Sequence, residues 1–252
     1  MMFRFNFDTA RAAMLAVGLL AGVFAAVPTT AARAGTVLLN AVEGSWIGTQ
    51  GGQAVSGLGT DEIRWGTPFG KGPRSGYGFE GSTEVPMEVM AGKAFALGTF
   101  THYNRVIHRG GGISGAQLSV DIALDIAGEE RTITSVFDFD HLETLNQAAI
   151  CGNGGKNGRG INAAGCADRV TAVTNFGQSE TFVIDGTIYQ FTITSFEGMT
   201  EFWTREEADN SAMLYGMFDQ IGTVPQVPLP GAVLLLGGAL TGLGAIAVRR
   251  RR

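Results

Sequence analysis

Few residues in this sequence have the types and spacing that chemistry requires. Its histidines are His102, His108 and His141, and none belongs to a His-Glu-x-x-His metal motif. If one strand continues from His102 to His108, the two side chains share a face, but six residues separate them by ~20 Å, too far for a shared metal. His141 stands alone in the sequence. We therefore predict no metal site built on histidine.

Carboxylates offer a second route to chemistry. Asp138 and Asp140 lie two positions apart on one face of an expected strand, where they could act as a glycosidase pair or bind calcium. Solvated charges at a sheet edge explain the same pair equally well. The sequence has no Gly-x-Ser-x-Gly or Walker motif, and the glycines at 110–112 lack the lysine and helix that phosphate binding requires. We predict no catalytic residue and no cofactor, with calcium as the lesser alternative.

The segment Thr101-His102-Tyr103-Asn104 is the most distinctive polar stretch inside the expected strands. Strand alternation places His102 and Asn104 on one face, about 7 Å apart, and Thr101 on the other. The two side chains could hold a ligand, or they could satisfy backbone groups where a loop crosses the sheet. We favour the structural role and keep ligand binding as the alternative.

Cys151 and Cys166 are the only two cysteines. If the chain is exported, an even pair predicts one disulfide. It would close the glycine-rich segment 152–165, which has little order of its own, and loop closure would contribute about 3 kcal/mol. A metal site is the weaker alternative, because no second Cys or His lies close in sequence.

The elements that must position these residues are strands. Between 113 and 126, apolar and polar side chains alternate with a period of two, which predicts a strand with one buried face. A turn at 127–130 leads into a second expected strand, 131–139. Later, Asp185-Gly186 separates two β-branched and aromatic runs, 181–184 and 187–191, and this pattern is a strong hairpin signal.

Shorter patterns predict further strands. They are expected at 36–42, 60–65, 76–79, 94–107, 169–174 and 213–218. Many strands at short spacing without a helical period indicate an all-β domain, an antiparallel β-sandwich that is jelly-roll-like. The polar, glycine-containing segments 51–59 and 66–76 are expected to be loops.

The N-terminal segment has the composition of a secretory signal. Arg4 and Arg11 flank the entry to an apolar run, 12–27, and a small-x-small cleavage site ends at Ala34. We predict a signal-peptide helix that is cut between Ala34 and Gly35. A retained N-terminal anchor is the alternative.

The C-terminal segment has the composition of a membrane anchor. The residues Val227-Pro228-Leu229-Pro230-Gly231 precede an uncharged run, 232–248, that would span ~25 Å as a helix. The cluster Arg249, Arg250, Arg251 and Arg252 follows, and basic flanks lie on the cytoplasmic side. Pro228 and Pro230 keep the motif extended, so that a processing enzyme could bind it. An ordinary single-pass anchor is the alternative.

Removing both end segments changes the charge. The net charge of the whole chain is −5, but the segment between the two ends has 11 basic and 22 acidic residues and a net charge of −11. An acidic exported domain argues against nucleic acid as a partner and favours solubility or divalent cations.

Two stretches resemble known families. The Val-Pro-Leu-Pro motif, the glycine-rich apolar run and the terminal arginines resemble the VPLPA variant of the PEP-CTERM sorting signal, although Gly231 stands where the commonest form has alanine. This resemblance implies processing by an exosortase of the inner membrane. The stretch around Thr101, His102 and Asn104 resembles the hallmark of the THxN family, which is related to the choice-of-anchor K domain. That resemblance extends more loosely over most of the domain and implies a surface or matrix role without an established activity.

These expectations divide the chain into five parts. They are a signal peptide at 1–34, an extracellular β-sandwich at 35–224, a sorting motif and linker at 225–231, a transmembrane helix at 232–248 and a cytoplasmic arginine cluster at 249–252. We expect a noncatalytic protein that is exported through the inner membrane and released to the cell surface or biofilm matrix. It would bind exopolysaccharide through exposed aromatics such as Trp46, Trp65 or Trp203. The alternative is a secreted carbohydrate-active enzyme on a jelly-roll scaffold.

Overall fold

The computed structural model describes residues 37–126 and 128–225. The chain divides into two units, Met1–Ala32 and Arg33–Arg252, and every described residue belongs to the second. The signal peptide with its cleavage site, the sorting motif, the apolar run and the arginine cluster lie outside the described residues. Within the described part of the chain, no helix is long and apolar enough to cross a membrane.

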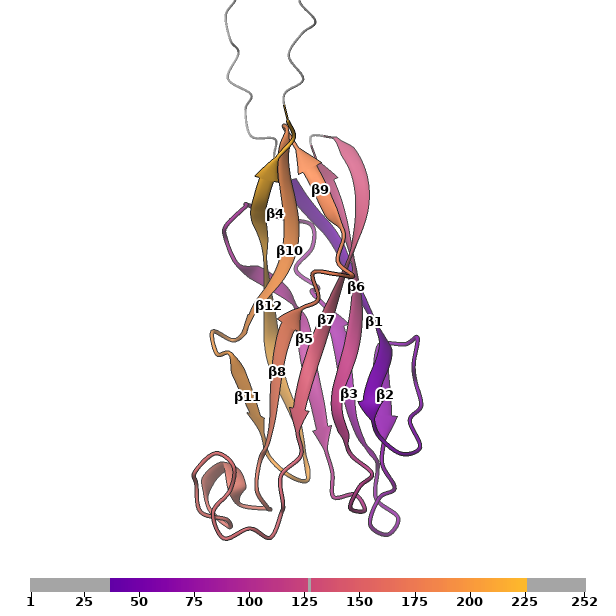
Figure 1. The fold of residues 1–252 in the computed structure, drawn as a ribbon, viewed down its shortest axis with the longest axis vertical. Coiled ribbons are helices and arrows are strands. Elements are labelled where there is room, and N and C mark those ends of the chain that lie inside the picture. The colour runs from indigo at the N-terminus through magenta and orange to yellow at the C-terminus, as the bar shows by residue number, and fades with distance from the viewer. Residues whose placement is uncertain (1–36, 127, 226–252) are drawn as a thin grey trace, which may run out of the picture. The chain divides into compact units, whose positions relative to one another are not determined.

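Two antiparallel sheets make up the described domain, which is a β-sandwich (Figure 1). The first sheet has the order β11 (Glu201–Thr204), β8 (Asp168–Thr174), β7 (Glu129–Leu142), β6 (Ile113–Ile126), β1 (Val37–Gly51) and β4 (Met87–Val89). The second has the order β2 (Glu62–Trp65), β3 (Ser75–Gly81), β5 (Phe95–Asn104), β12 (Ala208–Thr223), β10 (Thr187–Phe196) and β9 (Thr181–Ile184). The all-β prediction is therefore confirmed.

Strand β6 shows why alternation predicts this fold. Its apolar side chains at every second position are buried, and it has the predicted bounds, Ile113–Ile126. It pairs with β7 from Gly115 to Ile126, and Ile122 lies opposite Ile133. The hairpin between β9 and β10 is also confirmed. Asp185 and Gly186 have φ values of 48° and 75°, as a tight hairpin turn requires.

Aromatic side chains fill the space between the two sheets. Phe100 of β5 stacks on Phe139 of β7, with ring centroids 5.1 Å apart, and Trp46 of β1 lies 5.2 Å from Tyr77 of β3. Trp46 and Trp65 are both 0% exposed. The prediction that these two tryptophans are exposed for glycan binding was therefore wrong, because their large apolar rings are core residues.

Several strand bounds differ from prediction for identifiable reasons. Strand β1 continues to Gly51, but its register shifts after Leu39 and after Trp46, and these irregularities interrupt the period of two. Strands β4 and β11 were not predicted; they have three and four residues, and neither has the Asp-Gly turn that marked the equally short β9. Strand β5 ends at Asn104, so His108 does not continue the face of His102.

Strand ends and one long connection meet at one end of the sandwich. Leu142 at the end of β7 pairs with Arg169 of β8, and Thr204 at the end of β11 pairs with Asp168. In the middle of the other sheet, Asn104 at the end of β5 pairs with Ala208, the first residue of β12. The connection between β7 and β8 extends from this end (Figure 1). The fold thus brings four segments that are distant in sequence to one place.

Candidate functional site

The connection between β7 and β8 is closed by a disulfide. Cys151 and Cys166 are bonded and buried, which confirms the predicted pairing. The glycine-rich segment between them has more order than its composition suggests. Asn153 and Asn162 donate to each other through their side-chain amides, at 3.0 Å in both directions, and Asn157 Nδ2 donates to the Ala148 carbonyl. Side-chain amides therefore replace the missing regular backbone pairing.

Beneath this connection lie two histidines from opposite sheets. The rings of His102 on β5 and His141 on β7 are nearly perpendicular, with centroids 5.1 Å apart. Trp65 stacks on His102 at 6.1 Å. The prediction that His141 stands alone was therefore wrong, because its neighbours come from the facing sheet rather than from the nearby sequence.

The Thr-His-x-Asn stretch bonds to the end of β11. His102 Nδ1 lies 2.8 Å from Thr204 Oγ1, and Asn104 Nδ2 donates to the Thr204 carbonyl at 3.4 Å. Both side chains are 1% exposed, whereas Thr101 lies on the other face and bonds to Ser211. Since the Thr204 hydroxyl donates to the Asp168 carbonyl, it accepts from His102 Nδ1. Burial lowers the pKa of His102 well below its ordinary value, so the ring is neutral.

A second chain of contacts orients His141. Its Nδ1 lies 2.5 Å from the hydroxyl of Tyr77, and its Nε2 lies 3.2 Å from Glu143 Oε2. Burial raises the pKa of Tyr77 well above its ordinary value, so the phenol keeps its proton. The imidazole is therefore held on both sides, and its Nε2 faces the carboxylate of Glu143.

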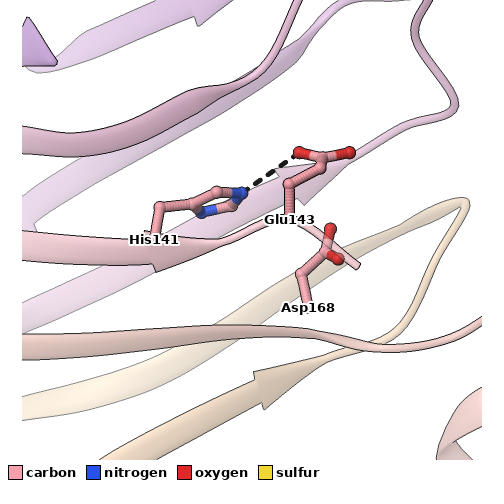
Figure 2. Close-up of side chains that lie close together, drawn as sticks. All are labelled: His141, Glu143 and Asp168. Carbon is pink, nitrogen blue, oxygen red and sulfur yellow. Dashed lines mark hydrogen bonds and ion pairs between the residues drawn. The ribbon is translucent and has the colours of Figure 1, made fainter. Parts of the chain in front are cut away.

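Carboxylates gather beside His141. The ligand atoms of His141, Glu143 and Asp168 all lie within 4.8 Å of one another, and the three side chains converge from β7, the residue after its end and the start of β8 (Figure 2). Asp168 is 0% exposed, and its Oδ1 accepts from the Thr144 backbone N–H at 2.7 Å. Glu206, in the turn between β11 and β12, is 2% exposed. These spacings suit a divalent metal ion.

Burial and mutual repulsion disfavour the charged forms of these acids. Burial, and next the charge of Glu143, raises the pKa of Asp168 to about 7. Burial, and next the charge of Asp168, raises the pKa of Glu206 to about 8. A cation among these carboxylates would offset both causes, because an opposite charge favours ionisation.

The predicted carboxylate pair lies elsewhere. Asp138 accepts hydrogen bonds from Gln117 and Asn175, and Asp140 is exposed on β7. Neither belongs to the cluster of His141, Glu143 and Asp168. Asp138 is thus part of a surface hydrogen-bond network between strands.

Two concave surfaces border the site. One cavity, of about 580 Å³, is lined by Phe69, His108, Glu143 and Asn146, among others, and reaches the carboxylate cluster through Glu143. His108, which sequence placed with His102, instead packs against Phe69 with ring centroids 4.6 Å apart. A second concavity, also of about 580 Å³, lies on the disulfide loop. Its lining includes Lys156, Arg159, Ile161 and the half-buried Trp203.

Comparison with known proteins adds no assignment. No protein-family model matches the sequence, and no curated protein matches it. The function must therefore be argued from the site.

The residues of the carboxylate cluster were not found by sequence reasoning. The acids and the tyrosine that bonds to His141 come from four separate segments, at Tyr77, Glu143, Asp168 and Glu206. No two of them are close enough in sequence to form a motif. The only available signal was Asp168, which stands two residues after Cys166, next to the predicted disulfide.

Proposed function

We propose that this chain is an exported, exosortase-sorted protein of the cell surface or extracellular matrix. The proposal rests on one observation, the order of motif, apolar run and arginine cluster in 227–252. Export through the inner membrane, brief anchoring by the C-terminal helix and release by an exosortase follow from that order. The disulfide supports export, since such bonds persist in oxidising compartments.

The proposed molecular role is noncatalytic binding of exopolysaccharide, on a sandwich that we classify as jelly-roll-like. The concavity on the disulfide loop supports this role. Trp203 supplies a partly exposed aromatic face, and Lys156 and Arg159 supply positive charge. An aromatic face packs against the apolar side of a sugar ring, and the two cations suit a polysaccharide with acidic groups. Nucleic acid is not among the proposed partners, since the domain is acidic.

A binding screen tests this role. The chain should bind acidic exopolysaccharide, and Trp203→Ala should weaken the binding at least tenfold. Phe176→Ala is the matched control, because Phe176 is a 61% exposed aromatic that does not line the concavity. Equal affinity of the Trp203 variant and the unmodified chain would contradict the proposed surface.

The alternative function, a secreted carbohydrate-active enzyme, has one observation in its favour. Glu143 borders a cavity of about 580 Å³ and has Asp168 close behind it. Burial opposes this function, because Asp168 is 0% exposed and cannot reach a polymer in the cavity, whereas Glu143 is 33% exposed. Release of reducing sugar that Glu143→Gln abolishes would favour the enzyme.

A further inference from the structure

Four side-chain oxygen atoms at the ends of the disulfide loop and in the β11–β12 turn have no hydrogen-bond partner among the residues that the structure describes. They are Asp168 Oδ2, both carboxylate oxygens of Glu206, and Asn146 Oδ1. Asp168 and Glu206 are almost fully buried, at 0% and 2% exposure. Leaving such groups without partners costs considerable free energy, so their number at one place indicates a ligand.

The four oxygens belong to side chains that lie together. A methyl group at Gly165 would lie 2.9 Å from Asn146 Oδ1 and 3.1 Å from Glu206 Cγ, so these two side chains flank the same point. Asp168 follows Gly165 by three residues. Glu143 is close to Asp168, within the 4.8 Å of the His141 group.

The charges of this cluster are not balanced by basic side chains. Among the described residues, the ion pairs of arginine involve Glu62, Asp209, Glu129 and Glu201, and none involves Glu143, Asp168 or Glu206. Among the described residues, the one basic side chain within ion-pair distance of Glu143 is His141. Asp168 and Glu206 are buried and Glu143 is exposed, and without Lys or Arg the two buried carboxylates need another source of positive charge.

We propose that Asp168 and Glu143, whose ligand atoms lie within 4.8 Å of each other, bind a calcium ion at the base of the disulfide loop, and that Glu206 and Asn146 contribute their unpartnered oxygens from its border. The donors are carboxylate and amide oxygens, which Ca²⁺ prefers and which Zn²⁺ sites rarely use as a set. His141 is the one nitrogen donor nearby, and Tyr77 and Glu143 already hold both of its ring nitrogens. Oxygen therefore dominates the donor set.

The ion would connect three segments of the chain. Glu143 and Asn146 precede the disulfide loop, Asp168 follows it, and Glu206 belongs to the turn between β11 and β12. Calcium would therefore fix both ends of the loop against the neighbouring turn. This inference does not depend on the proposed function, because sorting and glycan binding are measured separately.

Calcium titration of the full chain, purified in detergent and stripped with EDTA, tests the proposal. At a concentration 100 times the Kd, Ca²⁺ should raise the Tm by about 5 to 10 °C. Calorimetry should find one Ca²⁺ per chain, with Zn²⁺ at least tenfold weaker. No rise in Tm with Ca²⁺, or preferential binding of Zn²⁺, would overturn the assignment.

Variants locate the site. Glu206→Gln keeps the shape of a protonated glutamate, so it should fold in EDTA and yet bind Ca²⁺ at least tenfold more weakly. Glu43→Gln is the control, since Glu43 is exposed on β1, away from the cluster, and its variant should bind normally. A second variant, Asp168→Asn, should also bind Ca²⁺ at least tenfold more weakly. Undiminished affinity in both Glu206→Gln and Asp168→Asn would place the ion elsewhere and overturn the proposal.

Discussion

His102 and His141 face each other across the two sheets, with ring centroids 5.1 Å apart, although they lie 39 positions apart in the sequence. Each ring is held by a hydroxyl group, His102 by Thr204 and His141 by Tyr77. His141 in turn contacts Glu143 and lies in one cluster with Glu143 and Asp168.

The carboxylate cluster should make the metal-free chain less stable as the pH rises. Asp168 and Glu206 have folded-state pKa values of about 7 and about 8, above their ordinary values of 3.8 and 4.5. At a pH between the ordinary pKa of each acid and its folded-state pKa, the folded chain binds more protons than the unfolded chain. The free energy of unfolding therefore falls as the pH increases. From pH 6.5 to 8.5 the expected loss is about 3 kcal/mol.

Thermal unfolding in EDTA across that range measures the effect. The range begins at pH 6.5 because buried, neutral His102 destabilises the fold only below its ordinary pKa of 6.5. Glu206→Gln should flatten the decline, since it removes the carboxyl with the higher pKa. A decline of equal slope in this variant would show that another group is responsible.

The disulfide should stabilise the domain through its loop. Cys151→Ser should lower the free energy of unfolding by about 3 kcal/mol, because the unfolded chain gains the freedom that the closed loop denies it. The Tm should fall by several degrees, and reducing agent should lower the Tm of the unmodified chain but not of the variant. Equal Tm values for both chains would contradict this.

His102 and Asn104 should act as scaffold residues rather than as ligands. His102→Ala and Asn104→Ala should each destabilise the domain by about 1 to 3 kcal/mol, because Thr204 would lose its buried hydrogen-bond partners. Thr101→Ala is the matched control. It changes a neighbouring residue whose side chain bonds on the exposed face, and it should cost less than 1 kcal/mol.

If His102 and Asn104 bind a ligand instead, their variants should show the opposite result in stability and in binding. A group that binds a ligand is solvated in the free protein, so its loss would leave the Tm unchanged and abolish glycan binding. Chemical denaturation and glycan affinity, measured on the same variants, separate the two roles.

The C-terminal segment should be absent from the protein at the cell surface. If an exosortase processes the motif Val227-Pro228-Leu229-Pro230-Gly231, the intact mass of the surface protein should lack Arg249–Arg252. Pro228→Ala with Pro230→Ala should leave the chain in the inner membrane, because the motif would lose its extended shape. Recovery of a surface protein that ends at Arg252 would contradict processing, and the C-terminal segment would then be an ordinary membrane anchor.

Local patterns in the sequence determined the class of fold and the disulfide. Alternation with a period of two defined β6 and its buried face, and Asp185-Gly186 defined a hairpin, because these signals involve residues within a few positions of one another. The pairing of Cys151 with Cys166 followed from their number together with the expected export of the chain.

Tertiary structure decided the burial of Trp46 and Trp65 and the composition of the candidate site. Alternation says which face of a strand is apolar, but it does not say which strand of the other sheet lies opposite. His141 therefore looked isolated, although His102 and Tyr77 lie beside it. Asp168 and Glu206 looked like ordinary surface acids, because only the packing of β8 and the β11–β12 turn under the disulfide loop removes them from water.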